Sequence, residues 1–306
     1  MTTPAPTQRF RCSIAARERG DVPVGTAVPA PYWMLVGHPG PWPPKPIATE
    51  PLTEVAAELS ARLNAVGARL QLIRRHGRQG DTSDPSAGQS GRLEEGDAPE
   101  QPVFLVDVRR GLVGRATWRE PSDLVAIAER FDDLPDPTTE PLFLVCTHAR
   151  KDVCCAIDGR VVAAVLDDVL PGAVWETTHL GGDRFAGNVA ILPEGSMYGR
   201  LDGDVAPEVV LGHLDGRVDL DRWRGRSSWS PAAQVAVHAL LGELGGRLDE
   251  VPDPVVTALD QHRWQVDVDL AGATHRRVVT RTMSEAHQLT CTGGSKPQAL
   301  FEVVQA

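Results

Sequence analysis

The sequence predicts an α/β protein in which one order of strands and helices occurs twice and a small β-containing region follows. Short apolar runs typical of strands alternate with segments whose apolar residues recur at helical spacing. The order β-α-β-loop-β-β-α can be read in residues 1–139 and again in residues 140–246. Strands that alternate with helices are typical of a sheet that packs against helices.

In the first copy, the apolar runs and their flanking residues predict, in chain order, a strand at 32–37, a helix at 50–67, a strand at 69–75, a hairpin of 103–108 with 111–118, and a helix at 121–131. The first helix ends at Gly67, a residue suited to a C-cap. Ser122 or Asp123 lies near the cap of the second helix. Residues 76–102 contain almost no large apolar residue, so we expect a mobile loop there.

In the second copy, the same reasoning predicts a strand at 141–146, a helix at 159–170, a strand at 173–178, a hairpin of 188–193 with 196–201, and a helix at 206–214. A further helix at 231–244 has Ser230 as its cap and Pro231 in its first turn, and it ends at Gly245. Residues 263–283 alternate apolar and polar residues around a glycine, which predicts a hairpin in an appended region.

This order of elements is that of a thioredoxin-like domain, in which the loop after the first strand carries the chemistry. We therefore expect two tandem thioredoxin-like halves that arose by internal duplication. Gly37 aligns with Cys146, so the duplication would have kept its site in the second copy alone. The expected organisation is a degenerate half at 1–139, a functional half at 140–246 and a C-terminal hairpin region at 247–306.

Composition excludes several classes of function. The 306 residues carry a formal charge of -10, which argues against binding to nucleic acid or to an anionic membrane. No apolar run approaches the roughly 18 residues of a membrane span, and the N-terminus lacks the apolar core of a secretory signal. We therefore expect a cytoplasmic protein. Its five cysteines are unlikely to form structural disulfides there, and Cys12 and Cys291 are interpreted as isolated buried residues.

Three of the cysteines, Cys146, Cys154 and Cys155, lie within ten residues, and His179 and Asp183 follow in the segment HLGGD. The spacing of Cys146 and Cys155 matches neither a C-x-x-C redox motif nor a zinc-finger pair. His179 and Asp183 are four apart, and the strands before both loops are neighbours in a thioredoxin-like sheet. Two thiolates, an imidazole and a carboxylate meeting at one sheet edge would suit a soft-to-borderline metal. A redox thiol or a purely structural role remains open at this point.

The residues around these loops have plainer interpretations as well. A single histidine is more often a satisfied loop or core residue than a ligand, and Cys154 is interpreted as a bystander beside Cys155. Basic side chains could offset the charge of an anionic centre or could simply be solvated. These are His148, Arg150, Lys151 and Arg184.

Four ordered motifs resemble those of the sucrase/ferredoxin-like family, also described as thioredoxin-like [2Fe–2S] ferredoxins. They are GTAVPAPYWMLVGHPGPW (25–42), CTHARKDVCC (146–155), TTHLGGDRFAGNVAILPEGSMYGRL (178–201) and RGRSSWSPAAQ (224–234). The resemblance implies a [2Fe–2S] cluster held by two cysteines and by two histidines in an H-x-G-G-H pattern. The corresponding residues are Cys146, Cys155 and His179, and Asp183 stands where the family has the second histidine.

The resemblance thus implies a single-electron carrier without substrate chemistry, which would serve an unidentified redox partner protein. Asp183, Cys154 or water would complete the ligand set. An aspartate ligand would add negative charge and lower the reduction potential. Two alternatives remain: a thiol-disulfide or peroxide-reducing oxidoreductase that uses Cys146, Cys154 or Cys155, and a zinc-binding scaffold. The sucrase part of the family name has no support, because no paired acidic site of glycosidase type is evident.

Overall fold

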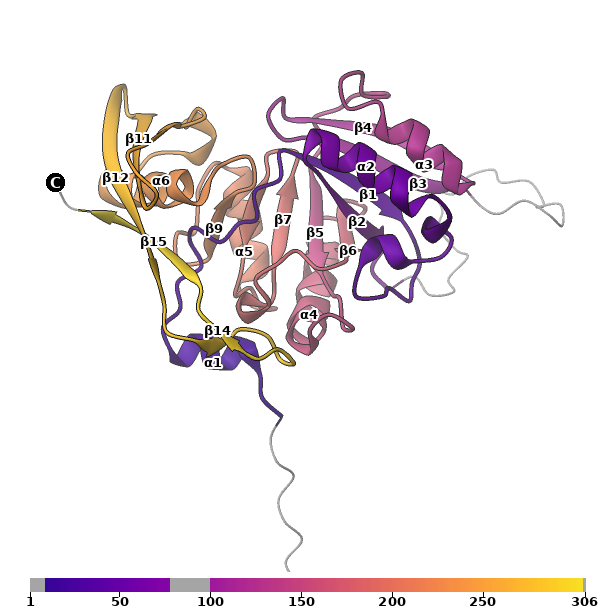
Figure 1. Ribbon diagram of the computed structural model, residues 1–306, viewed down its shortest axis with the longest axis horizontal. Helices are drawn as coiled ribbons and strands as arrows, with labels where there is room; N and C mark the ends of the chain where they lie inside the picture. The colour runs from indigo at the N-terminus through magenta and orange to yellow at the C-terminus, as the bar shows by residue number, and fades with distance from the viewer. Residues whose placement is uncertain (1–8, 78–99, 305–306) are drawn as a thin grey trace, which may run out of the picture.

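The computed structural model describes residues 9–77 and 100–304 and shows a mixed α/β protein (Figure 1). Its larger sheet has the strand order β4-β3-β1-β2-β6-β5-β7-β8-β9. These strands span Tyr32–Gly37 (β1), Ala68–Arg74 (β2), Gln101–Asp107 (β3), Leu112–Trp118 (β4), Leu142–Cys146 (β5), Val174–Thr177 (β6), Val189–Leu192 (β7), Ser196–Tyr198 (β8) and Trp223–Arg226 (β9).

The described α-helices and the C-terminal strands complete the fold. The helices are Cys12–Glu18 (α1), Ala56–Val66 (α2), Pro121–Ala128 (α3), Val153–Val169 (α4), Ala206–Leu214 (α5) and Pro231–Leu244 (α6). The strands are Val255–Ala258 (β10), Arg263–Leu270 (β11), Ala273–Met283 (β12), His287–Gln288 (β13), Ser295–Lys296 (β14) and Ala299–Val304 (β15). Within these described residues, no helix is both long and apolar enough to cross a membrane.

The large sheet contains two four-strand units with the same topology, and β9 pairs with β8 as its ninth strand. In the first, β1 is parallel to β2 and antiparallel to β3, which pairs with β4. In the second, β5 is parallel to β6 and antiparallel to β7, which pairs with β8. The units join where β2 and β6 pair antiparallel, at Ile73 with Thr177 and Arg74 with Glu176. The repeated order expected from the sequence is therefore present, in one continuous sheet.

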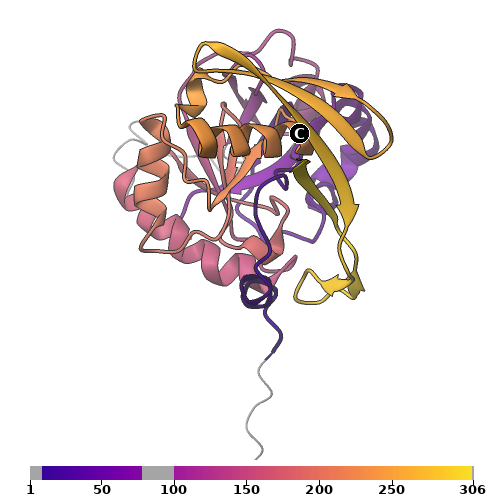
Figure 2. The ribbon, with the colours of Figure 1, turned by 90° about the vertical axis from the view of Figure 1, so that its left-hand side faces the viewer.

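Alternate side chains of the buried strands face different cores. Met34 and Val36 of β1 pack in a core with residues of α2 and α3, such as Leu59. Trp33 and Leu35 point to the other face and share a core with β5 and the candidate cysteines. A third core joins β5 to α4, α5 and α6, and it extends to the sheet of β10, β11, β12 and β15 that covers α6 (Figure 2).

Most predicted boundaries are confirmed. Helix α6 occupies the predicted residues, and the Ser230 side chain accepts a hydrogen bond from the backbone N–H of Ala233 at 3.3 Å. Gly67 ends α2 in the left-handed conformation, with φ of 70°. β11 and β12 form the predicted hairpin. The expected loop at 76–102 falls mostly outside the described residues.

Two helix starts differ from the prediction. The segment predicted as the start of a helix at 50–67 forms a short 3-10 helix, Leu52–Val55, before α2 begins. Helix α4 begins at Val153 rather than at Gly159, because Asp152 caps it by accepting a hydrogen bond from the Cys154 N–H at 2.9 Å. As a result, both Cys154 and Cys155 lie in the first turn of a helix.

Candidate metal centre

Two neighbouring strand ends bring the predicted residues together. Cys146 is the last residue of β5, and it pairs with Thr177 at the end of the parallel strand β6. His179 follows two residues later, and Cys155 reaches the same edge from the first turn of α4. The Sγ atoms of Cys146 and Cys155 and a ring nitrogen of His179 all lie within 4.8 Å of one another. Both cysteines are almost fully buried, and His179 is half-buried.

Gly159 explains how a strand and a helix come close enough to pair these thiols. It lies four residues after Cys155, on the same face of α4. A Cβ at Gly159 would lie only 2.0 Å from the carbonyl oxygen of Cys146, so no other residue fits without displacement of the helix. The missing side chain therefore lets α4 pack directly on the end of β5. This contact was not anticipated from the sequence.

Asp183 lies at the edge of this group. Its Oδ1 is 3.4 Å from Cys155 Sγ, which donates to it, and 2.9 Å from His179 Nδ1. The second contact is short enough for an ion pair, but its angle is not that of a hydrogen bond. Nδ1 is therefore a buried nitrogen without an aligned partner among the described residues. The glycine pair before Asp183, Gly181 and Gly182, has φ of 86° and 71°, which a side chain would disfavour.

The backbone of His179 is held from both sides. Its N–H donates to Nδ1 of His148 at 3.2 Å, so neutral His148 carries its proton on Nε2, which donates to the Trp42 carbonyl at 3.3 Å. Burial lowers the pKa of His148, which favours this neutral form. On the other side, Arg69 and Gln71 of β2 donate to the His179 carbonyl at 2.5 and 3.3 Å. The first half of the chain thus helps to position a residue of the second.

A fully buried arginine supports the loop that carries Asp183. Arg224 of β9 donates to the Gly181 carbonyl at 3.0 Å and to Asn188 Oδ1 at 2.8 Å, and a Cβ at Gly182 would lie 2.6 Å from its guanidinium. Burial lowers the pKa of Arg224 to about 9, and nearby arginines add to this effect, whereas Cys155 and Asp183 oppose it. Arg224 therefore places a positive charge behind the site.

Contacts among Cys146, Cys155 and His179 shift the pKa values of all three side chains. The pKa of Cys146 lies well below its usual value, chiefly because of its contact with the thiol of Cys155 and also because of His179, while burial opposes the shift. The pKa of Cys155 is raised by the same interaction, by burial and by the nearby Asp183. Burial alone would lower the pKa of His179, but its contacts with Asp183 and Cys146 raise it to about 9. Of the two thiols, Cys146 is therefore the more readily deprotonated.

The other residues singled out in the sequence lie in different places. Arg150 and Lys151 are exposed, and Arg184 contacts Asp21 at 3.2 Å. Cys154 faces away from Cys155 and contacts Cys291 and Arg11. The interpretation of Cys12 and Cys291 as isolated residues is wrong, because the chain path brings them into one group with Asp152 and Cys154.

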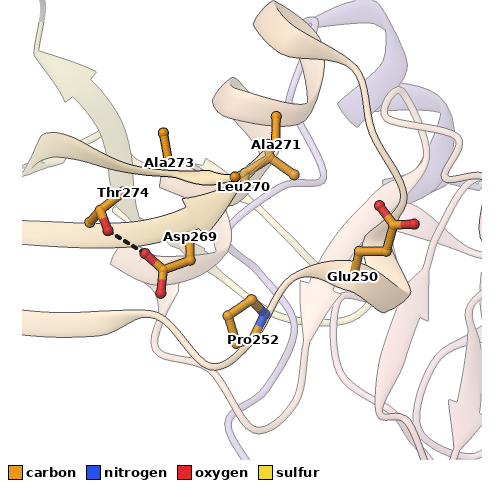
Figure 3. A pocket seen from close by; sticks show the side chains of 8 residues that line it. Glu250, Pro252, Asp269, Leu270, Ala271, Ala273 and Thr274 are labelled. Atoms are coloured by element: carbon orange, nitrogen blue, oxygen red, sulfur yellow. Dashed lines mark hydrogen bonds between the residues drawn. The ribbon is translucent and has the colours of Figure 1, made fainter.

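The structure also contains a pocket far from these residues in the chain, beside the turn between β11 and β12 (Figure 3). Its volume is about 410 Å³. Thr274 Oγ1 donates to Asp269 Oδ1 at 2.5 Å at its rim. The lining residues are Glu250, Pro252, Asp269, Leu270, Ala271, Gly272, Ala273 and Thr274. This set contains neither cysteine nor histidine, so the pocket is not part of the candidate centre.

Comparison with known proteins supports the resemblance seen in the motifs. The model of the sucrase/ferredoxin-like family matches residues 23–225, about two thirds of the chain. The chain belongs to the sucrase/ferredoxin-like family. The part of the chain that matches this sucrase/ferredoxin-like model includes Cys146, Cys155, His179 and Asp183 but neither Cys12 nor Cys291.

A curated relative is similar over a shorter segment. Altered inheritance of mitochondria protein 32 of Meyerozyma guilliermondii is 34% identical over 102 residues, which cover 28% of this chain and 35% of that protein. The match thus spans about a third of the relative's length. No solved structure matches this member of the sucrase/ferredoxin-like family.

Proposed function

We propose that this sucrase/ferredoxin-like protein is a single-electron carrier that binds one [2Fe–2S] cluster through Cys146, Cys155, His179 and Asp183. The observation that carries the proposal is the convergence of two buried thiols and an imidazole within 4.8 Å, from two loops at one sheet edge. When bound, such a cluster supplies reversible one-electron chemistry. The chain would hold it, set its charge and limit its contact with water.

The donor set fits such a group. Thiolates and imidazoles are the ligands that iron–sulfur clusters take from proteins. His179 Nδ1 is buried without an aligned hydrogen bond, although Asp183 lies 2.9 Å away, as expected of a nitrogen that is available to a metal. Asp183 is favoured over Cys154 as the fourth ligand, because Asp183 Oδ1 contacts Cys155 whereas the thiol of Cys154 faces another group.

The charges around the site support an anionic centre. Two thiolates and a carboxylate outweigh the charge of an oxidised [2Fe–2S] core, and reduction adds another negative charge. Arg224 is fully buried beside the loop, and Arg69 contacts the His179 backbone. Both cations would stabilise the reduced form and offset the lower potential that an aspartate ligand brings.

The topology supports placing this centre in a thioredoxin-like half. Each four-strand unit has the order fourth-third-first-second with the third strand antiparallel to the first. Cys146 and Gly37 both end the first strand of their unit, which is the position where a thioredoxin-like domain carries its chemistry. The first half would then be a degenerate copy that positions His179 through β2.

Anaerobic purification of the full chain tests this proposal. We expect a coloured protein with about two iron and two acid-labile sulfide ions per chain. Cys155→Ser and His179→Ala should lose the colour, whereas His262→Ala, a matched exposed histidine variant, should keep it. Colourless protein without iron or sulfide after anaerobic reconstitution would refute the proposal.

The same samples address the alternatives. A thiol-disulfide or peroxide-reducing enzyme would show a fast-reacting thiol and no chromophore, and a zinc scaffold would contain zinc without sulfide. The low pKa of Cys146 favours the thiol alternative, but its burial in a closed core, with 1% of its surface exposed, leaves a substrate no route to the sulfur. An electron can reach a buried centre without such access.

A further inference from the structure

A second group of thiols lies on the other side of the first turn of α4. It joins Cys12 at the start of α1, Cys154 and the capping residue Asp152 of α4, and Cys291 in the turn between β13 and β14. One ligand atom from each residue lies within 4.8 Å of the others. Figure 1 shows β14 beside α1 there, so segments from the N-terminal and C-terminal parts of the sequence lie together. Cys12, Cys154 and Asp152 are buried, and Cys291 is half-buried.

The separations match those of one tetrahedral metal site. Cys154 Sγ is 3.3 Å from Cys291 Sγ, which is 3.6 Å from Cys12 Sγ. Cys12 Sγ is 3.6 Å from both carboxylate oxygens of Asp152. In a tetrahedral site with zinc–sulfur bonds of about 2.3 Å, the sulfur atoms lie about 3.8 Å apart. The four groups therefore need only a small expansion to enclose a zinc ion.

A disulfide accounts for less of this arrangement. A bond between Cys154 and Cys291 would bring their sulfurs to about 2.0 Å and leave the third thiol, that of Cys12, packed against it without a bond. Three thiols and a carboxylate in mutual contact are better explained by a ligand that engages all of them. Thiolates joined by one carboxylate suit zinc, which takes both sulfur and oxygen donors in fourfold coordination.

The surrounding hydrogen bonds position the Asp152 carboxylate and favour the thiolate of Cys154. Asp152 Oδ1 accepts from the Cys154 N–H at 2.9 Å and Oδ2 from the Cys291 N–H at 2.7 Å, which fixes the carboxylate and leaves each oxygen a further lone pair. Arg11 Nε donates to Cys154 Sγ at 3.2 Å. A cation at that distance stabilises a thiolate and offsets part of the excess negative charge of a three-thiolate zinc site.

We propose that Cys12, Asp152, Cys154 and Cys291 bind one structural zinc ion, which ties the N-terminal helix and the C-terminal β13–β14 hairpin to the start of α4. Four protein ligands make a closed site, which is typical of structural rather than catalytic zinc. The site shares no residue with the proposed cluster. Cys12 and Cys291 lie outside the segment that matches the family model, so the zinc site is an addition to that family's core.

Metal analysis of the full chain, purified from zinc-supplemented cells, tests the proposal. Wild type should contain about one zinc per chain. Cys291→Ser should lose at least 80% of that zinc and keep the iron of the wild type. The matched control Thr292→Ala, an exposed neighbour in the same turn, should keep both metals. Cys146→Ser should keep zinc whether or not wild type contains iron, so the two proposals can fail separately.

Three results would overturn the proposal: wild type without zinc, zinc that is lost from Cys146→Ser but kept by Cys291→Ser, and a Cys154–Cys291 disulfide in a non-reducing peptide map of wild type. If Cys291→Ser does not fold, a measurement on wild type alone still tests the proposal. Stepwise titration of the thiols with a mercurial reagent, in the presence of a zinc-sensitive dye, should release the zinc as the three thiols are modified. Release of no zinc would overturn the proposal as well.

Discussion

The contact between Gly159 and the end of β5 leads to a prediction about the packing that builds the candidate metal centre. Gly159→Ala adds one methyl group in the middle of α4. In an exposed helix this change would stabilise the protein by about 1 kcal/mol, because glycine is the poorer helix former. Here the new carbon would lie 2.0 Å from the carbonyl oxygen of Cys146. A backbone oxygen cannot rotate away as a side chain can, so α4 must move.

The size of the effect follows from that distance. A carbon and an oxygen in ordinary contact lie more than 3 Å apart, so the helix must move by roughly 1 Å or more. Overpacking of a core usually costs about 1–3 kcal/mol, and a clash with backbone belongs at or above the top of that range. After subtraction of the gain in helix propensity, we expect a net loss of about 2–3 kcal/mol in the free energy of unfolding. The iron content should fall too, because Cys155 moves with the helix.

Two other helical glycines provide matched controls. At Gly212 in α5 and Gly242 in α6, the nearest atoms to a new Cβ are side-chain atoms at 3.7 and 3.6 Å, which is ordinary contact. Replacing either with alanine should raise the free energy of unfolding by about 0.5–1 kcal/mol. Chemical denaturation followed by circular dichroism measures all three variants. A Gly159→Ala protein as stable as Gly212→Ala, with the iron content of wild type, would refute the reasoning.

Two further predictions concern charge near the site. Burial alone would raise the pKa of Glu176, but hydrogen bonds from Arg74 at 2.7 Å and His76 at 2.8 Å lower it. The charge of Glu176 therefore stabilises the fold above about pH 4.5, and this contribution is lost as pH falls through the lowered pKa. Glu176→Gln should therefore cost about 2 kcal/mol at pH 7 and less at pH 3, measured by urea denaturation at both pH values; an equal loss at both would contradict this. Asp183→His should raise the reduction potential by on the order of 100 mV in protein-film voltammetry, since it replaces an anionic donor with a neutral one. An unchanged potential and paramagnetic resonance spectrum would show that Asp183 does not bind iron.

Most secondary structure could be predicted because its signals are local. Continuous apolar runs define β1 and β5, and the serine, proline and glycine around α6 set both of its ends. The start of α4 was missed because residues 153–158, VCCAID, are predicted as part of the preceding loop, and valine, isoleucine and cysteine are weak helix formers. Its actual start depends on the Asp152 cap. That aspartate also binds the Cys291 N–H, a contact that no local pattern reveals.

The candidate centre was predictable where ligands follow neighbouring strand ends, as Cys146 and His179 do. Groups assembled by the overall chain path were not. Cys12 and Cys154 are separated by 142 positions in the chain, and nothing near either one indicates the other. Arg224 was missed for a similar reason. An arginine is expected at the surface, and its burial is possible only because carbonyl and amide oxygens of the HLGGD segment and its neighbours receive its hydrogen bonds.

The first turn of α4 connects the two proposed centres. Successive residues of a helix point about 100° apart, so adjacent Cys154 and Cys155 can serve sites on different sides of one turn. The positive end of the helix dipole favours thiolates in this turn, and at Cys155 it acts against the effect of Cys146, burial and Asp183, which raise the pKa. Asp152 caps this turn and also contacts Cys12, so an ion bound beside Asp152 would fix the turn that carries Cys155. The close packing of Gly159 fixes the same helix against the end of β5. A rigid ligand position limits the structural rearrangement that accompanies electron transfer. The proposed zinc ion would therefore support electron transfer at the cluster by holding Cys155 in place.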